Sequence, residues 1–440
     1  MHMVLIANMP IARAENNAPY GLSTRFIPKP FLRMPHLGGG KIPALLSQTG
    51  AFSVTAKLVP SKGLIPYDII VPFWSDAASK SRWVSIPNEK IQYSSTGDWN
   101  FPQGTVFIKT FELSTDATAP NSKRRLETRL LVRDAHGGVY GAVYKWRPDN
   151  SDADLLQTSQ TETILIKTAR GDAHTQTWYY PSPSDCLACH NAKTSGILGV
   201  KARQLNRTLT YSSGITDNEI RVWNHLKLFA PEVPESDLAS LPTLAGMGDS
   251  SRSTEDRARS YLDANCAQCH RPGGTVAYFD LRYDTPLEKQ QIIDGPVLID
   301  QGIDKPRVVS PHDIWRSIAF MRVNTVEDIK MPPIGRETID LPGVELLRNW
   351  INSLPGRSVL EPPTISPSGG TFKDPVDITL AAVEPGADIH YTLDGSLPGL
   401  SDPRYEKPIR LEGSTVIRAR AYKDGFTRSI ATQEIFIINQ

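Results

Sequence analysis

All four cysteines of this 440-residue sequence belong to the same pentapeptide pattern, C-x-x-C-H. The two copies are Cys186-Leu187-Ala188-Cys189-His190 and Cys266-Ala267-Gln268-Cys269-His270. Two thiols at this spacing can add across the two vinyl groups of one porphyrin, and the adjacent histidine is then held beneath the iron as a ligand. The sequence therefore predicts two covalently bound c-type haems, with iron ligated by His190 and by His270.

Three other uses of paired cysteines explain less of the pattern. A four-cysteine zinc site would leave a histidine at the same place in both motifs unexplained. A thioredoxin-like redox pair would need a preceding strand and a following helix, yet Cys186 follows the turn-rich run Pro181-Ser182-Pro183-Ser184-Asp185. Structural disulfides suit an exported protein, but cysteines this close in sequence seldom bridge for stability.

A helix should deliver the first thiol of the second motif. Ser253 or Thr254 can cap it, and the apolar positions that follow share one face at helical spacing. These positions are Ala258, Tyr261, Leu262 and Cys266. A second helix is predicted before Pro355-Gly356, because Val344, Leu347, Ile351 and Leu354 form an apolar stripe.

Met331 lies 61 residues after His270 (331 − 270) and precedes Pro332 and Pro333, which keep its backbone free of helix. The segment resembles the distal methionine loop of cytochromes c, so Met331 is the candidate sixth ligand of the second iron. The alternative is an ordinary core methionine. Together with the two helices, this loop predicts a cytochrome c-like domain over residues 251–356.

The sixth ligand of the first iron is left open by the sequence. Met247, His225 and His174 are the candidates, and each also has an ordinary interpretation as a surface or packing residue. The stretch Ile220, Trp223, Leu226 and Leu228 predicts a helix on the wall of this first segment, residues 181–250.

Residues 20–180 are predicted to be β-rich, with strands at 105–113, 126–133 and 139–146 separated by turn-forming runs. Aromatic side chains recur in this region: Phe73, Trp74, Trp83, Trp99, Trp146 and Trp178. We expect them to form a core, the alternative being a sugar-stacking surface.

A proline-rich linker, residues 357–366, is predicted to lead into a C-terminal immunoglobulin-like β-sandwich over residues 367–440. Three segments resemble the chitobiase/β-hexosaminidase C-terminal-like domain: Pro367-Ser368-Gly369-Gly370, His390-Tyr391-Thr392-Leu393-Asp394-Gly395-Ser396 and Ile417-Arg418-Ala419-Arg420-Ala421. That family's domain is an accessory module without catalytic residues of its own, so the resemblance does not imply a glycosidase.

The rest of the chain resembles a family of bacterial dihaem cytochromes that join a β-rich N-terminal region to two C-x-x-C-H motifs. Phrases that carry the likeness include Gly63-Leu64-Ile65-Pro66-Tyr67-Asp68, Phe73-Trp74-Ser75-Asp76, Gln204-Leu205-Asn206-Arg207 and Arg257-Ala258-Arg259-Ser260-Tyr261-Leu262. The resemblance implies extracytoplasmic electron transfer, and some relatives resemble partners or fusions of quinoprotein sugar dehydrogenases.

The net charge and the lengths of the apolar runs limit the possible partners and location of the protein. Lys and Arg total 48 against 47 for Asp and Glu, so we expect no nucleic acid partner. Residues 1–14 resemble a short export signal ending in Ala12-Arg13-Ala14. No later run reaches the roughly 18 apolar residues of a membrane span, which predicts a periplasmic or secreted protein.

The sequence thus predicts a multidomain protein with a β-rich N-terminal domain, a mainly α cytochrome c-type haem region and a C-terminal sandwich. Its expected function is outer-sphere electron transfer between redox proteins, as a carrier rather than an enzyme, with a separate sugar or alcohol dehydrogenase as the donor. The alternatives are a dihaem peroxidase, which needs an iron with an open sixth position, and a carbohydrate-bound module that delivers electrons.

Overall fold

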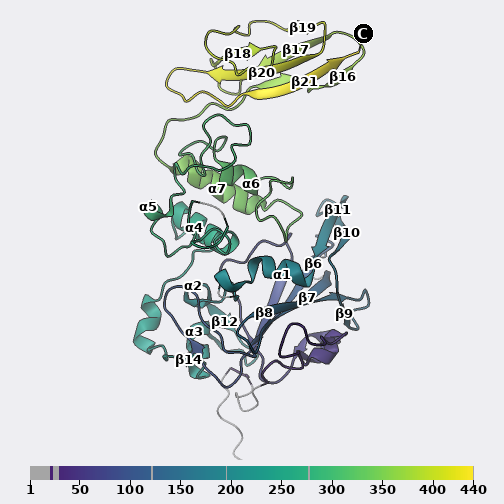
Figure 1. The fold of residues 1–440 in the computed structure, drawn as a ribbon, viewed down its shortest axis with the longest axis vertical. Helices are drawn as coiled ribbons and strands as arrows, with labels where there is room; N and C mark the ends of the chain where they lie inside the picture. The colour runs from purple at the N-terminus through teal and green to yellow at the C-terminus, as the bar shows by residue number, and fades with distance from the viewer. Residues whose placement is uncertain (1–19, 23–28, 120–121, 195, 276–277, 440) are drawn as a thin grey trace, which may run out of the picture. The chain divides into compact units, whose positions relative to one another are not determined.

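The computed structural model describes residues 20–22, 29–119, 122–194, 196–275 and 278–439. The predicted export signal, residues 1–14, lies outside the described residues. The chain divides into two compact units: Met1–Gly246 with Ile334–Thr338, and Met247–Pro333 with Ile339–Gln440 (Figure 1). The first C-x-x-C-H motif therefore belongs to the same unit as the β-rich region, and the second motif belongs to the same unit as the C-terminal domain.

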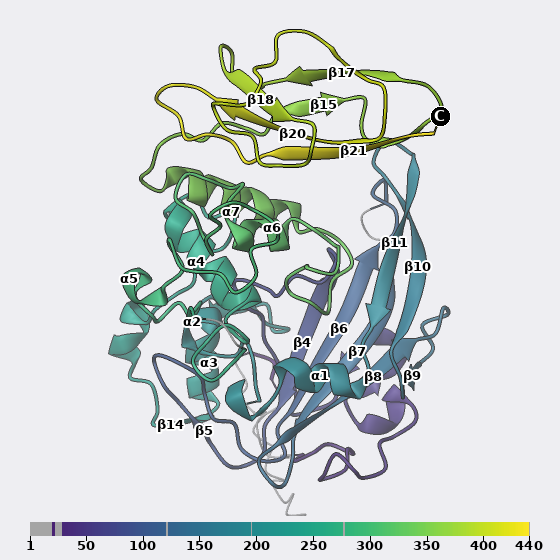
Figure 2. The ribbon, with the colours of Figure 1, turned by 45° about the horizontal axis from the view of Figure 1, so that its top comes forward.

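A six-stranded antiparallel sheet organises the first unit (Figure 2). Its strands, in spatial order, are β3 (Ile65–Pro66), β4 (Ser79–Ser85), β6 (Val106–Ser114), β7 (Lys123–Arg133), β8 (Val139–Trp146) and β9 (Ala153–Leu155). The three strands predicted from sequence are β6, β7 and β8, within a few residues at their ends. A separate hairpin follows, formed by β10 (Gln160–Lys167) and β11 (Ala173–Tyr180).

The two faces of this sheet differ in what covers them. One face packs against an N-terminal segment containing the 3-10 helix η1 (Leu46–Thr49) and buries Ile108, Leu130 and Tyr144. The opposite face carries two separate apolar clusters, one around Phe107 and the other around Phe111. Trp146 is buried on the first face, and Trp99 and Trp178 are buried in the two clusters of the opposite face. This confirms the prediction of an aromatic core for these three.

Residues 181–250 form a mixed segment and not a mainly α one. It contains α1 (Pro183–Cys189), α2 (Ala202–Leu205), α3 (Glu219–His225), the 3-10 helices η3 (Ala192–Thr194) and η4 (Glu235–Ser240), and the short strands β12 (Thr208–Thr210), β13 (Thr216–Asn218) and β14 (Phe229–Ala230). β14 pairs with β5 (Ile91–Gln92), and the predicted helix around Trp223 is α3, which packs into the Phe107 cluster. The small helices lack a core of their own, so they pack on the sheet.

The remaining elements of the N-terminal region are short. They are β1 (Phe52–Val54), which pairs with β2 (Val59–Pro60), and the 3-10 helix η2 (Thr55–Lys57) between them.

Helices surround the second motif, as the apolar spacing predicts. They are α4 (Thr254–Asn265), α5 (Leu287–Gln290), α6 (Ile318–Val323) and α7 (Leu341–Ser353). Ser253 is the N-cap of α4, and its hydroxyl accepts a hydrogen bond from the Asp256 backbone N–H at 3.1 Å. Helices α4 and α7 approach closely at Gly343, where an added Cβ would lie 2.6 Å from the Tyr261 ring. Only glycine therefore fits this crossing without displacing the tyrosine.

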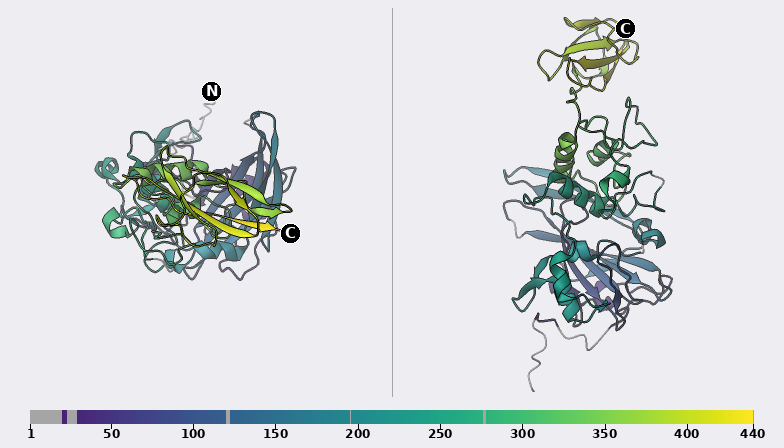
Figure 3. Two further views of the ribbon diagram at one scale, coloured as in Figure 1. Left: turned by 90° about the horizontal axis from the view of Figure 1, so that it is seen from above. Right: turned by 90° about the vertical axis from the view of Figure 1, so that its left-hand side faces the viewer.

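The C-terminal region is a pair of β-sheets, seen as the yellow module in Figure 3. One sheet has the order β15 (Thr364–Ser366), β17 (Val376–Ala381), β19 (Ile409–Leu411); the other has β16 (Gly370–Phe372), β21 (Thr432–Ile438), β20 (Thr415–Tyr422), β18 (Asp388–Thr392). Their facing side chains form one core that includes Ile378, Ile417 and Phe436. This two-sheet arrangement is consistent with an immunoglobulin-like domain.

The predicted linker 357–366 is not a free tether. Its last three residues form β15, and Leu360 is buried, with its backbone N–H donating to the Thr427 carbonyl at 3.0 Å. Leu360 and Ile365, which lie among the prolines of this segment, both contact the sandwich, Leu360 through Thr427 and Ile365 in the core. The sandwich therefore begins before residue 367. Within the described residues, no helix combines the length and apolar character needed to cross a bilayer.

A cluster of charged groups joins the sandwich to the helical part of the second unit. The Asp304 carboxylate lies 3.2 Å from Arg316, 3.1 Å from Arg420 and 3.2 Å from Arg428. Arg316 also donates to the backbone carbonyls of Arg428 and Ser429, at 3.2 Å each. Because Asp304, Arg316 and Arg420 are nearly buried, removing one partner would leave an uncompensated charge.

Candidate cofactor-attachment sites

The first motif lies on helix α1, which begins directly after strand β11. Ser182 caps this helix by accepting from the Asp185 N–H at 3.3 Å, and the Asp185 carboxylate accepts from the Ser182 N–H at 2.8 Å. The run 181–185 was interpreted from sequence as a turn before Cys186. It is instead the cap and first turn of the helix that contains Cys186, because proline at the first helical position and a capping box both start helices.

Helix α1 lies across strand β8 (Figures 1 and 2). Cys186 packs against the sheet. A Cβ added to Gly141 would lie 2.8 Å from the Cys186 Sγ, so the absence of a side chain at Gly141 makes room for the thiol. Cys186 packs at the edge of the cluster that contains Phe111, Val143 and Trp178. One thiol of the first motif is thus placed against the face of the sheet.

His190 ends the motif with its ring orientation fixed. Its Nδ1 lies 2.9 Å from the Gly196 carbonyl, so Nδ1 carries the proton and Nε2 is left with a lone pair. Burial, opposed by the Gly196 hydrogen bond and aided by the nearby charges of Lys109 and Arg129, lowers the pKa of His190 to about 4. The ring is therefore neutral at neutral pH, which is the form that binds iron.

Two cavities flank α1. One of about 410 Å³ is lined by Leu187, His190 and Arg133, and one of about 1000 Å³ is lined by Leu187, Gly141 and Tyr140. Val139 and Leu187 line both cavities. Together they have the size of sites that hold organic cofactors.

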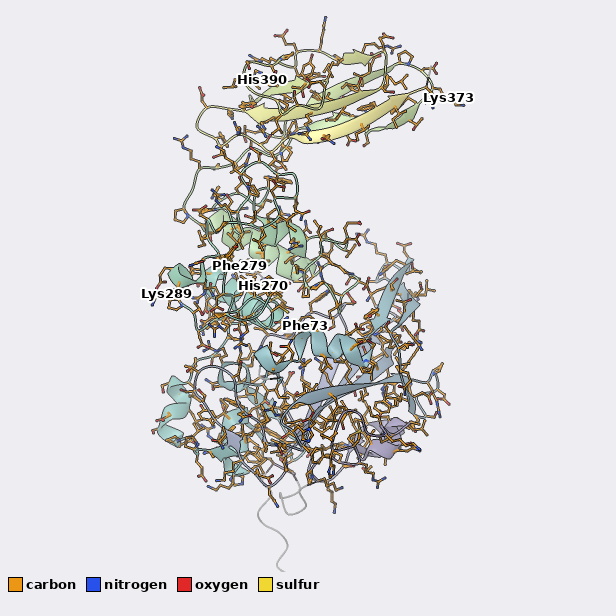
Figure 4. All side chains as sticks on the ribbon, viewed as in Figure 1. Phe73, His270, Phe279, Lys289, Lys373 and His390 are labelled. Carbon is orange, nitrogen blue, oxygen red and sulfur yellow. The ribbon has the colours of Figure 1, made fainter. Side chains whose placement is uncertain are left out.

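The second motif follows α4 in a tight turn. Cys266 is the C-cap of the helix, and the backbone N–H groups of Cys269 and His270 donate to its carbonyl at 3.1 Å and 3.0 Å. The His270 ring stacks on Phe279 with centroids 4.7 Å apart. Both residues are labelled in Figure 4. Burial lowers the pKa of His270 to about 4, so this ring too is neutral at neutral pH.

The His270 Nδ1 differs from that of His190. It is buried and, among the described residues, has no hydrogen-bond partner. A buried polar atom of this kind costs free energy unless something compensates. The neutral histidine rings and the four cysteines that form no disulfide bond fit a c-type haem at each motif.

The candidate sixth ligands are placed differently. The Met331 N–H donates to the Arg322 carbonyl at 2.8 Å, and the Arg322 charge contributes to the lowered pKa of His270, so the Met331 loop and His270 share a neighbour. Met247 packs against the core of the second unit and not of the first. His225 and His174 belong to the first unit, where both are exposed.

Strand β11 followed by helix α1 provides the strand and helix that a thioredoxin-like pair needs at the first motif, but the other requirements of the competing uses are not met. In the described part of the chain, no three His, Cys, Asp or Glu side chains converge as a zinc site requires. A redox-active thiol needs a lowered pKa, whereas burial raises the pKa of Cys186.

The sequence alone does not indicate that Gly141, Phe279 and three basic residues on the sheet face near Cys186 belong to the surroundings of the two motifs. Two of the basic residues have a signal in the sequence, because Lys109 and Arg129 are basic positions next to the buried apolar Ile108 and Leu130, whereas Arg82 is itself buried.

Comparison with known proteins identifies a known domain at the C-terminal end of the chain. No curated protein matches the sequence. Residues 367–434 match the chitobiase/β-hexosaminidase C-terminal domain, so the C-terminal region is similar to that accessory domain.

Proposed function

We propose that this protein is an extracytoplasmic dihaem c-type cytochrome that transfers electrons between redox proteins. One haem would be held by Cys186, Cys189 and His190, and the other by Cys266, Cys269 and His270, with Met331 as the sixth ligand of the second iron. The observation that carries the proposal is the pairing, twice in one chain, of two non-bridged thiols with a partly buried, neutral imidazole at the next position.

A bound haem supplies a one-electron ferric–ferrous couple, and the protein sets its potential through ligands, burial and nearby charge. The residues of this chain would anchor the haem, orient it and shield it from water. The Gly196 carbonyl fixes the His190 tautomer, and the sheet and helix α7 exclude water on one side of each motif. Transfer by this route needs no substrate pocket, which favours a carrier over a peroxidase.

The proposed location is the periplasm or the exterior, because thiol–haem attachment takes place after export. The donor would be a separate dehydrogenase acting on sugars or alcohols. The match of residues 367–434 to a chitobiase accessory domain favours one addition, namely that the sandwich docks the carrier on a glycan or surface.

The test is expression with an export signal and cytochrome c maturation. A denaturing gel stained for haem, together with the intact mass, should show two covalent haems per chain, and a redox titration should resolve two potentials. A mass equal to that of the bare polypeptide after export and maturation would refute the proposal. A cytoplasmic preparation of the same chain is the control and should carry no covalent haem.

A further inference from the structure

Three basic side chains form a row across the sheet face on which α1 lies. Arg82 on β4 pairs directly with Lys109 on β6, and Lys109 pairs directly with Arg129 on β7. Residues paired directly across antiparallel strands project to the same face. Like charges in such positions destabilise a sheet, so a row of three requires compensation.

Two of the three cations have carboxylate partners. Arg82 pairs with Asp68, and Arg129 makes a two-pronged contact with Glu127 at 2.9 Å and 2.6 Å. Lys109 has no carboxylate within ion-pair distance among the described residues. Its ammonium lies 5.2 Å from the centre of the Phe111 ring, which the Arg129 guanidinium also covers at 4.4 Å. The row therefore lacks negative charge at its centre.

The row lies beside the first C-x-x-C-H motif. Gly141, which makes room for the Cys186 Sγ, pairs with Leu131, and Leu131 is two residues along the same face from Arg129. Cys186 also packs against the cluster that contains Phe111, and Lys109 and Arg129 both lie over the Phe111 ring. Burial and the neighbouring cations Arg82, Arg129 and Lys80 also hold the pKa of Lys109 well below its usual value. The row thus lies on the sheet face beside Cys186, and its central member, Lys109, has no carboxylate in ion-pair contact within the described part of the chain.

We infer that the row of Arg82, Lys109 and Arg129 is a carboxylate site that receives the propionate groups of the haem bound at Cys186 and Cys189, with Lys109 as its central donor. The inference rests on the proposed function. A porphyrin fixed through its vinyl groups keeps two propionates, which are anions at neutral pH, as simple carboxylates are. An ammonium without a carboxylate of its own is the group that such an anion would neutralise.

The test compares Lys109→Met, which removes the charge at similar length, with Lys109→Arg, which keeps it. Loss of a cation next to a haem favours the ferric form. In the full-length protein carrying both haems, Lys109→Met should lower one of the two reduction potentials and leave the other within error. The pH dependence of that potential should move to higher pH, because a carboxylate without its cation has a raised pKa. Lys109→Arg should leave both potentials near those of the wild type.

Lys123→Met is the matched control, since Lys123 is exposed at the far end of the strand that carries Arg129, and it should shift neither potential. Unchanged potentials in Lys109→Met with both haems retained would overturn the inference while leaving the proposed function intact. An altered haem spectrum in both Lys109→Met and Lys109→Arg would also overturn it, because it would make Lys109 an iron ligand.

Two further measurements separate the source of the carboxylate. Titration with citrate at constant ionic strength should not shift the wild-type potentials; a shift that disappears in Lys109→Met would assign the row to a free carboxylate and overturn the inference. In urea unfolding of the haem-free chain, Lys109→Met should raise the midpoint of the first unit, because it relieves repulsion among the three cations. In the haem-bound chain, the same substitution should lower this midpoint. The same sign in both forms would contradict a site completed by the haem. A wild-type first motif without haem would refute the inference and the proposed function together.

Discussion

The same pentapeptide occurs in two unlike surroundings. Around the first, a six-stranded sheet supplies the wall, and basic side chains occupy that wall beside Cys186. Around the second, helices α4 and α7 supply an apolar wall, and an aromatic ring stacks on His270. The first imidazole has its Nδ1 partner within the chain, whereas the second has none among the described residues.

This difference predicts that the first motif is held by a preformed scaffold and the second depends on its cofactor. The first unit has a large sheet with two covered faces, so it can fold around an empty site. Among its described residues, the helical part of the second unit has four helices of 4 to 13 residues with long connections. Such short helices gain most of their stability from packing.

The largest expected effect is therefore loss of the second anchor. Replacing Cys266 and Cys269 by Ala should remove one haem and also lower the helical signal in circular dichroism, since α4 and α7 lose their shared partner. The matched replacement of Cys186 and Cys189 should remove one haem and leave the β-sheet signal intact. Equal loss of secondary structure in the two variants would contradict the comparison, and intact mass counts the haem in each.

Next in size is the change at Met331. A thioether ligand raises the reduction potential relative to a second imidazole and gives the oxidised protein a weak far-red band. Met331→His should lower one potential and abolish that band, and Met331→Ala should abolish the band. Met247→Ala is the control, because Met247 packs into the same core of the second unit. If Met331→Ala leaves band and titration unchanged, the ligand lies elsewhere.

Two glycine substitutions should each lower the stability of one unit without changing that of the other. Gly141→Ala places a Cβ 2.8 Å from the Cys186 Sγ, and Gly343→Ala places one 2.6 Å from the Tyr261 ring. Overpacking of this kind costs about 1–3 kcal/mol. We expect Gly141→Ala to lower the urea midpoint of the first unit alone and Gly343→Ala that of the second alone. Coincident shifts of both transitions would mean that the units unfold together.

The two units should also respond oppositely to pH. Burial, opposed by the Asp68 N–H and by Arg207, raises the pKa of Glu219 from 4.5 to about 8. Because the folded state holds this proton more tightly than the unfolded chain, its contribution is complete below pH 4.5 and is lost as pH rises to 8. The loss is on the order of 5 kcal/mol over the whole window.

Glu219→Gln should abolish the loss of stability that the first unit shows as pH rises from 4.5 to 8, and leave the opposite rise toward neutral pH that the lowered pKa of His190 causes, as followed by denaturant unfolding at several pH values. In the second unit, hydrogen bonds from Arg282 and Thr285 outweigh burial and lower the pKa of Asp280, so its stability should instead fall toward acid. A first unit that is equally stable at pH 5 and pH 8 would contradict the assignment to Glu219.

The smallest effect on the haems is expected from loss of the sandwich. Truncation after Gly356 should keep both haems and both potentials within error, because both motifs and Met331 precede it. The truncation removes Arg420 and Arg428 from Asp304, so the second unit should lose stability, by about 1–3 kcal/mol. Asp304→Asn in the full chain is the matched comparison and should cause a similar loss. A changed potential in the truncated protein would place the sandwich in the haem environment.

Local signals in the sequence determined much of this protein. The C-x-x-C-H spacing is a property of five consecutive residues, the Ser253 cap and the apolar face of α4 are one helix long, and strands β6, β7 and β8 follow from apolar alternation. The likeness of the C-terminal segment to an accessory domain is likewise carried by short phrases, and residues 367–434 match that domain.

Only the tertiary structure decided what lies beside each motif. Arg82, Lys109 and Arg129 are 27 and 20 residues apart in the chain (109 − 82 and 129 − 109), and strand register alone makes them neighbours. Gly141 matters because α1 crosses β8 above it, and the segment 181–250 is mixed because its short helices pack on the sheet instead of on each other. The physical reason is that contacts between distant segments depend on pairing and packing, which no local pattern encodes.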